Sequence, residues 1–205
     1  MFFSCLFCKT FLFNKIYCID CYNSIPLKFH YFYIENMKIY GSCVYNNITS
    51  NPILELKYNF NPFIVKAIGQ FIFNEIKISW NFDYLVPIPI RWYKNLSRGY
   101  NQSYLIAQEL SKKTYIPVID LLKKIDHKTQ TNTTAQERIN APQLAIHKNI
   151  PIGSKILIID DVITTGATML SAYNLLKNHY RVEGLVFNYS KKFVNKKDLM
   201  DLFNI

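Results

Sequence analysis

The segment ILIIDDVITTGAT, residues 156–168, carries the clearest structural signal in the chain. Its four leading apolar residues are typical of a short strand that is buried on both faces of a sheet. Two carboxylates, Asp160 and Asp161, follow at the carboxyl end of that strand, and a short loop then leads into a predicted helix. Because ligands of open α/β sheets bind at the carboxyl ends of the strands, we expect a binding site here.

The loop behind the two carboxylates has the composition of a phosphate-binding loop. Its backbone N–H groups and the start of the next helix offer an anion site, and Gly166 lets the backbone approach a phosphate closely. The carboxylates would repel that phosphate, so we assign them to sugar hydroxyls or to a metal held by a diphosphate. The alternative is a buried strand followed by a plain turn. The residues assigned to the phosphate are Thr164, Thr165, Gly166, Ala167 and Thr168.

Predicted strands and helices alternate around this segment, which favours a parallel sheet with right-handed crossovers. The predicted strands are 84–88, 118–122, 155–159 and 182–189, and the predicted helices are 51–58, 61–76, 102–113 and 167–178. A hairpin is expected at 28–45, a long polar loop or flap at 126–142, and a solvated lysine-rich tail from Lys191. The fold class is therefore α/β, with a core domain in 51–205 behind a small module with the hairpin in 1–50.

A second motif, VPIPIR at residues 86–91, ends a predicted strand on two prolines that stiffen the following loop. Arginine offers phosphate a fixed fork of donors that lysine lacks. The chain has only four arginines, and three of them lie in or beside the polar loops around the expected site: Arg91, Arg98 and Arg138. This placement favours anion binding, with solvated basic loops as the alternative.

Several of these segments resemble known families. Residues 156–168 resemble the phosphoribosyl pyrophosphate (PRPP) signature of type I phosphoribosyltransferases. Together with the VPIP strand end and the RGYNQ helix start at 98–102, they are similar to the ComF family, which comprises competence-associated proteins with a phosphoribosyltransferase fold. The segment LKY at 56–58 resembles a family motif, and residues 130–140 resemble the family's flap. The resemblance covers nearly the whole chain.

This resemblance implies a type I phosphoribosyltransferase-like parallel-sheet core that binds PRPP together with Mg²⁺. Asp160 and Asp161 would face the ribose 2′- and 3′-hydroxyls, and the loop at 164–168 would cradle the 5′-phosphate. Arg98 joins the two acids as a catalytic residue if the chain is an enzyme, because it would carry leaving-group charge. The residues implied for the pyrophosphate loop are Pro87, Arg91 and Lys94, and the flap residue is Arg138.

Four cysteines near the N-terminus, Cys5, Cys8, Cys18 and Cys21, form two C-x-x-C pairs. Two such pairs suit a tetrahedral, structural zinc site with four thiolate ligands, and the ComF resemblance implies the same element. A disulfide is disfavoured in a reducing cytoplasm, and a redox C-x-x-C normally opens a helix after a strand, which is not expected here. Plain core cysteines are the third interpretation. Cys43 is left over and is predicted to be a core residue.

Composition limits the remaining function classes. The chain has 205 residues, half of them hydrophobic, which suits a domain with a sizeable core and excludes a disordered chain. No stretch reaches the roughly 18–20 apolar residues of a membrane helix, and the apolar start lacks the basic region of a secretory signal, so we predict a cytoplasmic protein. The net charge of +10 and the many aromatic residues suit single-stranded nucleic acid as a partner, and the ComF resemblance to competence proteins favours it. Lysine enrichment from an AT-rich genome is the alternative explanation.

Three hypotheses about function follow. The first is a PRPP-binding, ComF-like protein that handles incoming single-stranded DNA in the cytoplasm during natural transformation, beside a DNA-uptake ATPase or helicase or another competence protein. The second is an active phosphoribosyltransferase that displaces pyrophosphate at C1′ in favour of an unknown amine or base. The third is a zinc-ribbon nucleic-acid module on a degenerate fold. The intact phosphate loop favours PRPP binding.

Overall fold

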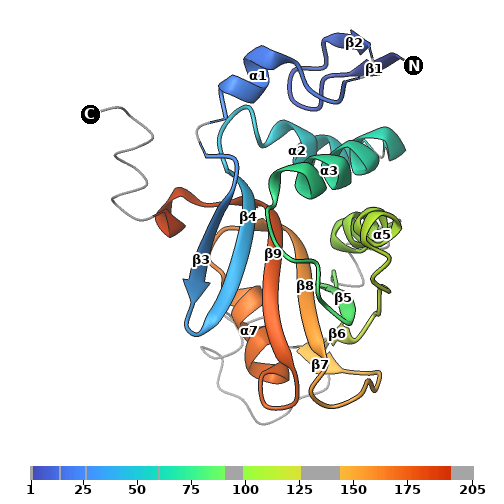
Figure 1. The fold of residues 1–205 in the computed structure, drawn as a ribbon, viewed down its shortest axis with the longest axis vertical. Helices are drawn as coiled ribbons and strands as arrows, with labels where there is room; N and C mark the ends of the chain where they lie inside the picture. Colours follow the sequence, from blue (N-terminus) through green and yellow to red (C-terminus); the bar gives the residue numbers. More distant parts are fainter. Residues whose placement is uncertain are drawn as a thin grey trace.

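The computed structural model describes residues 2–13, 15–25, 27–59, 61–90, 99–125 and 144–194. Its centre is a five-stranded sheet in the order β3–β4–β9–β8–β5 (Figure 1). Strands β4, β9, β8 and β5 are parallel, and β3 pairs with β4 as an antiparallel hairpin at one edge. The strand bounds are β3 His30–Ile34, β4 Met37–Val44, β5 Tyr84–Pro87, β8 Lys155–Ile163 and β9 Arg181–Tyr189. The predicted α/β class with a parallel-sheet core is confirmed.

Helices cover both faces of this sheet because alternate residues of each strand point to opposite sides. Leu157 and Ile159 of β8 join the core formed with α2, α3 and α5, whereas Ile156 and Ile158 pack in the core that contains α7. Figure 1 shows these two groups of helices on either side of the strands. The helix bounds are α2 Asn51–Tyr58, α3 Pro62–Glu75, α5 Gln102–Thr114 and α7 Ala167–Leu176.

All four predicted helices begin within one residue of the predicted start. The Asn61 side chain accepts a hydrogen bond from the Phe63 N–H at the start of α3, where a proline occupies the first turn. Asn101 caps α5 in the same way, with bonds from the Ser103 and Tyr104 N–H groups. Helix α7 begins after Gly166, whose φ of 87° no other residue adopts easily, and this N-cap makes no side-chain hydrogen bond.

Two predicted strands differ from the observed ones. Val118 makes only an isolated parallel bridge to Leu85, because the chain turns at 119–121 and leaves the edge of β5. The paired strand there is β6 (Leu122–Lys124), which is antiparallel to β7 (Leu144–Ile146). Strand β8 runs four residues beyond the predicted end at 159, since Asp160 to Ile163 continue the pairing with β9.

The N-terminal module packs directly on the helices. It contains the hairpin of β1 (Phe2–Ser4) and β2 (Phe11–Phe13) and the short helix α1 (Ile19–Asn23). The Phe7 ring meets Phe71 of α3 with centroids 5.4 Å apart, and the Asn51 amide donates to the Phe7 carbonyl at 3.0 Å. The β3–β4 hairpin, which the sequence analysis grouped with the module in 1–50, instead forms an edge of the main sheet, because β4 pairs with β9. The division at residue 50 stays a prediction.

Two further regions bear on the sequence-based expectations. Cys43 is fully buried and its thiol donates to Asn188 Oδ1 at 3.0 Å, so it is a core residue as predicted. The start of the lysine-rich tail is packed rather than fully solvated, because Phe193 of the 3₁₀ turn η2 (Lys191–Phe193) stacks on Phe32 with centroids 4.7 Å apart. Within the described ranges, no helix combines the length and apolarity needed to cross a bilayer.

Candidate functional site

A cavity of about 210 Å³ lies at the carboxyl ends of β5 and β8, where the sequence predicts a binding site. Residues from α2, α5, α7, β6 and β8 meet there with the loop that follows β5. The lining includes Lys57, Asn101, Gln102, Ser103, Asp160, Asp161 and Thr168. Both predicted carboxylates and one residue of the predicted phosphate loop therefore face the same space.

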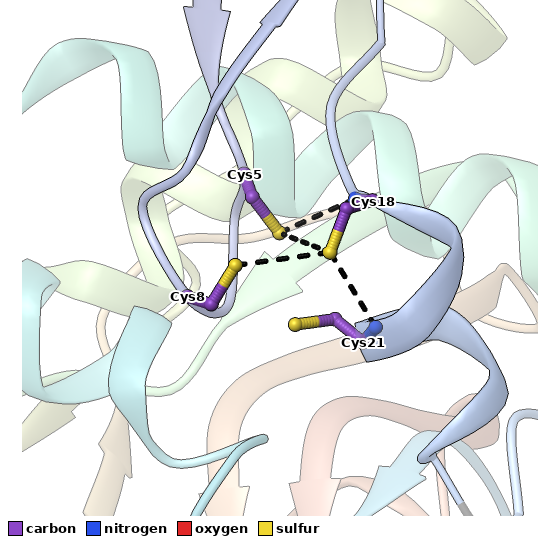
Figure 2. A group of neighbouring side chains, drawn as sticks. All are labelled: Cys5, Cys8, Cys18 and Cys21. Atoms are coloured by element: carbon purple, nitrogen blue, oxygen red, sulfur yellow. Dashed lines mark hydrogen bonds between the residues drawn. The ribbon is translucent and has the colours of Figure 1, made fainter.

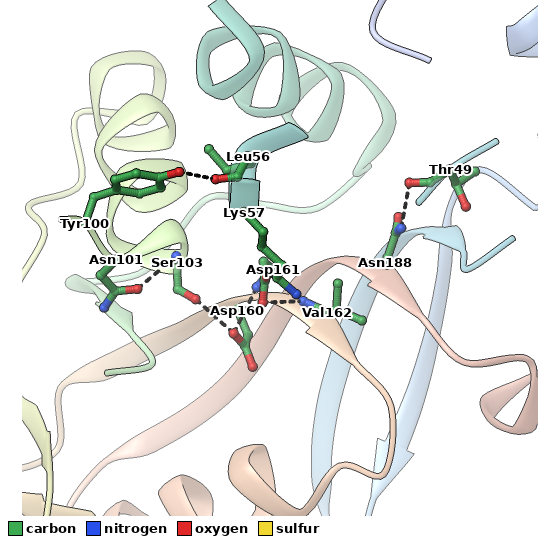
Figure 3. A network of polar contacts seen from close by, with 10 residues as sticks. All are labelled: Thr49, Leu56, Lys57, Tyr100, Asn101, Ser103, Asp160, Asp161, Val162 and Asn188. Carbon is green, nitrogen blue, oxygen red and sulfur yellow. Dashed lines mark hydrogen bonds and ion pairs between the residues drawn. The ribbon is translucent and has the colours of Figure 1, made fainter. Parts of the chain in front are cut away.

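Asp160 is held in place by two hydrogen bonds to one oxygen. The Ser103 hydroxyl donates to Oδ1 at 2.8 Å, and the Asp161 N–H donates to the same atom at 2.9 Å (Figure 3). Burial, reinforced by the adjacent charge of Asp161, raises the pKa of Asp160 to about 7, although the Ser103 hydrogen bond opposes the rise. Near neutral pH this carboxyl group can therefore both accept and release a proton.

Asp161 is paired with a cation from another element. Its Oδ1 accepts the Val162 N–H at 2.9 Å, and its Oδ2 lies 3.0 Å from the Lys57 Nζ at the end of α2 (Figure 3). The sequence analysis noted Lys57 only as part of the LKY segment and gave it no role. This ion pair places a positive charge beside the cavity.

Residues of the RGYNQ segment form hydrogen bonds that connect the elements around the cavity. The Asn101 amide donates to the Ile88 carbonyl at 3.0 Å, which joins the start of α5 to the loop after β5. The Tyr100 hydroxyl donates to the Leu56 carbonyl at 2.5 Å, which joins α5 to α2. Gln102 is only 5% exposed, and its amide nitrogen has no hydrogen-bond partner within the described part of the chain. A buried donor of this kind on a cavity wall is suited to a ligand oxygen.

The predicted phosphate loop lies between β8 and α7. Thr164 and Thr165 are exposed, and Thr168 lines the cavity from the first turn of the helix. A Cβ atom on Gly166 would lie 2.6 Å from Cδ1 of Ile34 in the neighbouring hairpin. The Ile34 methyl could shift away, but the positive φ favours glycine here whether or not a phosphate approaches it. Substitution of Gly166 would strain the loop directly and would not test phosphate binding cleanly.

The remaining predicted site residues are not gathered in the described cavity. Pro87 is the buried last residue of β5, opposite Ile159, and Pro89 lines the cavity instead. The other residues lie outside the described ranges, so their assignments to catalysis, pyrophosphate and flap stay predictions. These residues are Arg91, Lys94, Arg98 and Arg138.

The four N-terminal cysteines converge as a possible metal centre (Figure 2). Their sulfur atoms all lie within 4.8 Å of one another, and the Sγ of Cys18 is 3.7 Å from those of Cys5 and Cys8. A tetrahedron with Zn–S bonds of about 2.3 Å has sulfurs about 3.8 Å apart. The hydroxyl of Thr10, 3.2 Å from the Cys8 sulfur, lowers the pKa of that thiol to about 6. The cluster could therefore hold a metal ion.

The second cysteine pair does begin a helix, contrary to the sequence-based expectation. Cys18 is the N-cap of α1, and its sulfur accepts the Cys21 N–H at 3.4 Å. None of the five cysteines is in a disulfide. Since Cys5 and Cys8 come within contact distance of this pair, the arrangement favours a four-thiolate metal centre over a two-cysteine redox pair.

Comparison with known proteins identifies the family of this chain. The model of the phosphoribosyl transferase domain matches residues 61–183. The chain belongs to this phosphoribosyl transferase domain family. The match includes both carboxylates, the loop at 164–168 and the start of α5, and it excludes the cysteine cluster. The phosphoribosyltransferase-like core inferred from the sequence is thereby confirmed.

Curated competence proteins are also similar to this phosphoribosyl transferase domain protein, which confirms the ComF resemblance. Competence protein F of Haemophilus influenzae is 35% identical over 99 residues, which cover 45% of this chain and 43% of that protein. Competence protein ComFC of Bacillus subtilis is 27% identical over 139 residues, covering 66% of this chain and 55% of that protein. Together with ComFC of Streptococcus pneumoniae, these matches span about half the length of the curated relatives.

Solved structures of low sequence identity are also similar to this chain. Adenine phosphoribosyltransferase of Thermoanaerobacter pseudethanolicus is 16% identical and superposes with a TM-score of 0.48, covering 87% of this chain and 93% of that one. The adenine phosphoribosyltransferase of Saccharomyces cerevisiae has a TM-score of 0.40 and 17% identity, covering 88% of this chain and 95% of that one. The fold assignment of the phosphoribosyl transferase domain rests on the family match and on the sheet topology.

The raised pKa of Asp160 predicts a pH dependence of stability in the unliganded protein. The unfolded carboxyl has a pKa of about 4, so the stability linked to this group is fully present below pH of about 4 and is lost as the pH rises through about 7. Asp160→Asn keeps an acceptor for Ser103 but cannot ionise. Melting temperatures measured from pH 4 to 8 should therefore fall less steeply for the variant, and parallel curves would contradict the burial of this charge.

Proposed function

We propose that this protein binds PRPP, or a related phosphoribosyl ligand, in the cavity at the carboxyl ends of β5 and β8. The observation that carries the proposal is the convergence of Asp160 and Asp161 with the start of α7 in that cavity. The two acids are acceptors for a vicinal diol, and a helix N-terminus attracts a phosphate. A ligand with a phosphate at one end and a ribose diol in the middle satisfies both features.

Each part of such a ligand has a counterpart in the chain. The 5′-phosphate would bind at the loop of 164–168, and the ribose hydroxyls would donate to Asp160 and Asp161. The unpaired Gln102 amide could donate to a further ligand oxygen. Mg²⁺ binds oxygen ligands and is often shared between carboxylates and substrate phosphates, and the two carboxylates fit that donor set. Bound Mg²⁺ would neutralise diphosphate charge, together with the predicted contacts of Arg91, Lys94 and Arg98.

We assign the cysteine cluster a structural role, as a zinc site that stabilises the fold. Four thiolates complete a tetrahedral Zn²⁺ site and leave no position open for substrate. Cys5 and Cys21 are buried in the same core as α3, and Lys9, directly after Cys8, forms an ion pair with Glu55 of α2. Zinc would therefore fix the N-terminal module against the helices that position Lys57.

The proposed role of this protein is in DNA uptake during natural transformation, where it would handle incoming single-stranded DNA in the cytoplasm beside a DNA-uptake ATPase or another competence protein. The similar curated proteins from three bacteria are all named competence proteins, which supports this role. The net charge of +10 supports a polyanionic partner.

Transfer of the phosphoribosyl group to an amine or base is the second candidate. It is favoured by Asp160, whose pKa near neutrality suits proton exchange with a ligand in the cavity. In that reaction the acids would hold the ribose while pyrophosphate leaves C1′.

A thermal-shift experiment with Mg-PRPP tests the proposed binding. We expect Mg-PRPP to raise the melting temperature of the full chain, and ribose 5-phosphate to give a smaller rise because it lacks the diphosphate. Pyrophosphate release in the presence of a panel of bases would favour the enzyme, and binding without release would favour the binding protein. An unchanged melting temperature at millimolar Mg-PRPP would overturn the proposal.

A further inference from the structure

A wide groove in the described part of the protein lies at the opposite end of the sheet from the acidic cavity. It has a volume of about 770 Å³ and is formed where β8 and β9 begin, beside the hairpin of β3 and β4. The segment that joins α3 to β5 borders it, and Figure 1 shows this segment crossing the sheet face below the helices. The helical layer thus covers the upper part of this face and leaves the lower part open.

The groove is strongly basic. Its four cationic residues are Lys38, Lys77, Lys155 and Arg181. Lys155 and Arg181 are paired in register at the start of their strands, so their side chains leave the sheet on the same side. Among the described residues of the lining, Glu183 is the single carboxylate, and the Tyr40 hydroxyl donates to it at 2.6 Å. Within the described ranges, no carboxylate lies within ion-pair distance of the four cations.

Aromatic residues line the groove together with these cationic residues. Phe29, Tyr31, Tyr40 and Phe82 line the same groove. The Lys38 ammonium is 4.4 Å from the centroid of the Tyr31 ring, which is 49% exposed. Tyr31 also lines a second groove of about 520 Å³ along the edge strand β3, which contains Tyr33 and Lys192. An extended chain could therefore pass from one groove to the next over the Tyr31 ring.

We propose that this groove binds single-stranded nucleic acid, with its cations on the phosphates and the exposed Tyr31 ring stacked on a base. Proteins that bind single strands combine a basic groove with aromatic stacking platforms. A duplex hides its base faces, and a small phosphate ester would need no row of rings. The inference rests on the proposed DNA-handling role and gives that role a location. It is independent of PRPP binding, because the two sites lie at opposite ends of β8.

Fluorescence anisotropy with the full chain and a labelled oligothymidylate of about 15 nucleotides tests the proposal. Wild-type affinity should fall with salt, with a log–log slope of about −0.7 for each phosphate contact. The double substitution Lys155→Gln and Arg181→Gln should reduce that slope by about 1.4. The matched control, Lys112→Gln with Lys148→Gln, removes the same charge outside the groove and should leave the slope unchanged.

A second pair of variants tests the stacking. Tyr31→Ala should weaken oligothymidylate binding between about 5-fold and 150-fold, whereas Tyr45→Ala, a similarly exposed tyrosine outside the groove, should not. Four results would each overturn the assignment. Two are equal affinities for groove and control variants, and equal binding of a duplex. The others are displacement of the oligonucleotide by polyglutamate of matched charge, and no binding by the wild type at low salt.

The Mg-PRPP melting shift, measured on the same variants, separates this inference from the proposed function. Groove variants that lose oligonucleotide binding should keep the full shift. If the wild type shows no Mg-PRPP shift but the groove variants still lose oligonucleotide binding, the PRPP proposal fails and the groove assignment stands.

Discussion

Replacing Asp161 by alanine is expected to remove most of the stabilisation that Mg-PRPP gives the wild-type protein. At a ligand concentration about 100 times its dissociation constant, binding to the folded state alone contributes about 2.7 kcal/mol to stability. In the variant the ribose diol loses a carboxylate acceptor. Lys57 also loses its ion-pair partner, which lies 3.0 Å from its Nζ in the wild type. Melting temperatures with and without Mg-PRPP measure the difference for each protein.

Two control variants make this measurement specific. Asp161→Asn keeps the shape and one acceptor oxygen, so it should retain part of the ligand-induced shift. Asp120→Ala removes a carboxylate that is half-exposed and lies near His147 outside the cavity, and it should retain the whole shift. Because each comparison uses the unliganded form of the same variant as its reference, a change in intrinsic stability does not affect the result. Equal shifts for the wild type and Asp161→Ala would place the ligand elsewhere.

Loss of the proposed zinc ion is expected to destabilise the chain more than any single surface substitution. Binding of structural zinc provides about 10–16 kcal/mol in zinc-finger peptides at neutral pH, and this free energy stabilises the folded state. Here Cys5 and Cys21 share a core with Phe7 and Phe71, so an unfolded module would expose apolar surface of α3. Chelation at neutral pH should therefore lower the melting temperature and release one equivalent of zinc.

Cys8→Ser is the variant that tests this effect best. Cys8 is the one exposed member of the cluster, so the substitution removes a ligand without opening a cavity in the core. We expect it to lower both the bound zinc and the melting temperature. Cys43→Ala is the matched control, because it removes a buried thiol outside the cluster and should leave zinc content unchanged while lowering stability. Purified wild-type protein without zinc, or with a melting temperature that chelation does not change, would contradict the prediction.

The features that could be read from the sequence are those encoded locally. The apolar run at 156–159 predicts a buried strand because each of its residues faces a core, and the Asn61–Pro62 and Asn101 caps act within one helical turn. The spacing of the two cysteine pairs likewise predicts a ligand set from neighbouring residues. These patterns are sufficient for the fold class, the position of the acidic pair and the four-cysteine cluster.

Contacts between distant segments required the folded chain. Ser103 bonds to Asp160 across 57 residues of sequence, and Lys57 reaches Asp161 from a different helix. Val118 shows the same limit, because its β-branched neighbourhood suits a strand, yet the early turn leaves it a single bridge on the edge of β5. The order of strands and the packing of helices set these distances, and no local periodicity encodes them. The basic groove arises in the same way, since Lys38, Lys155 and Arg181 meet only where three strands begin or turn side by side and the helical layer ends.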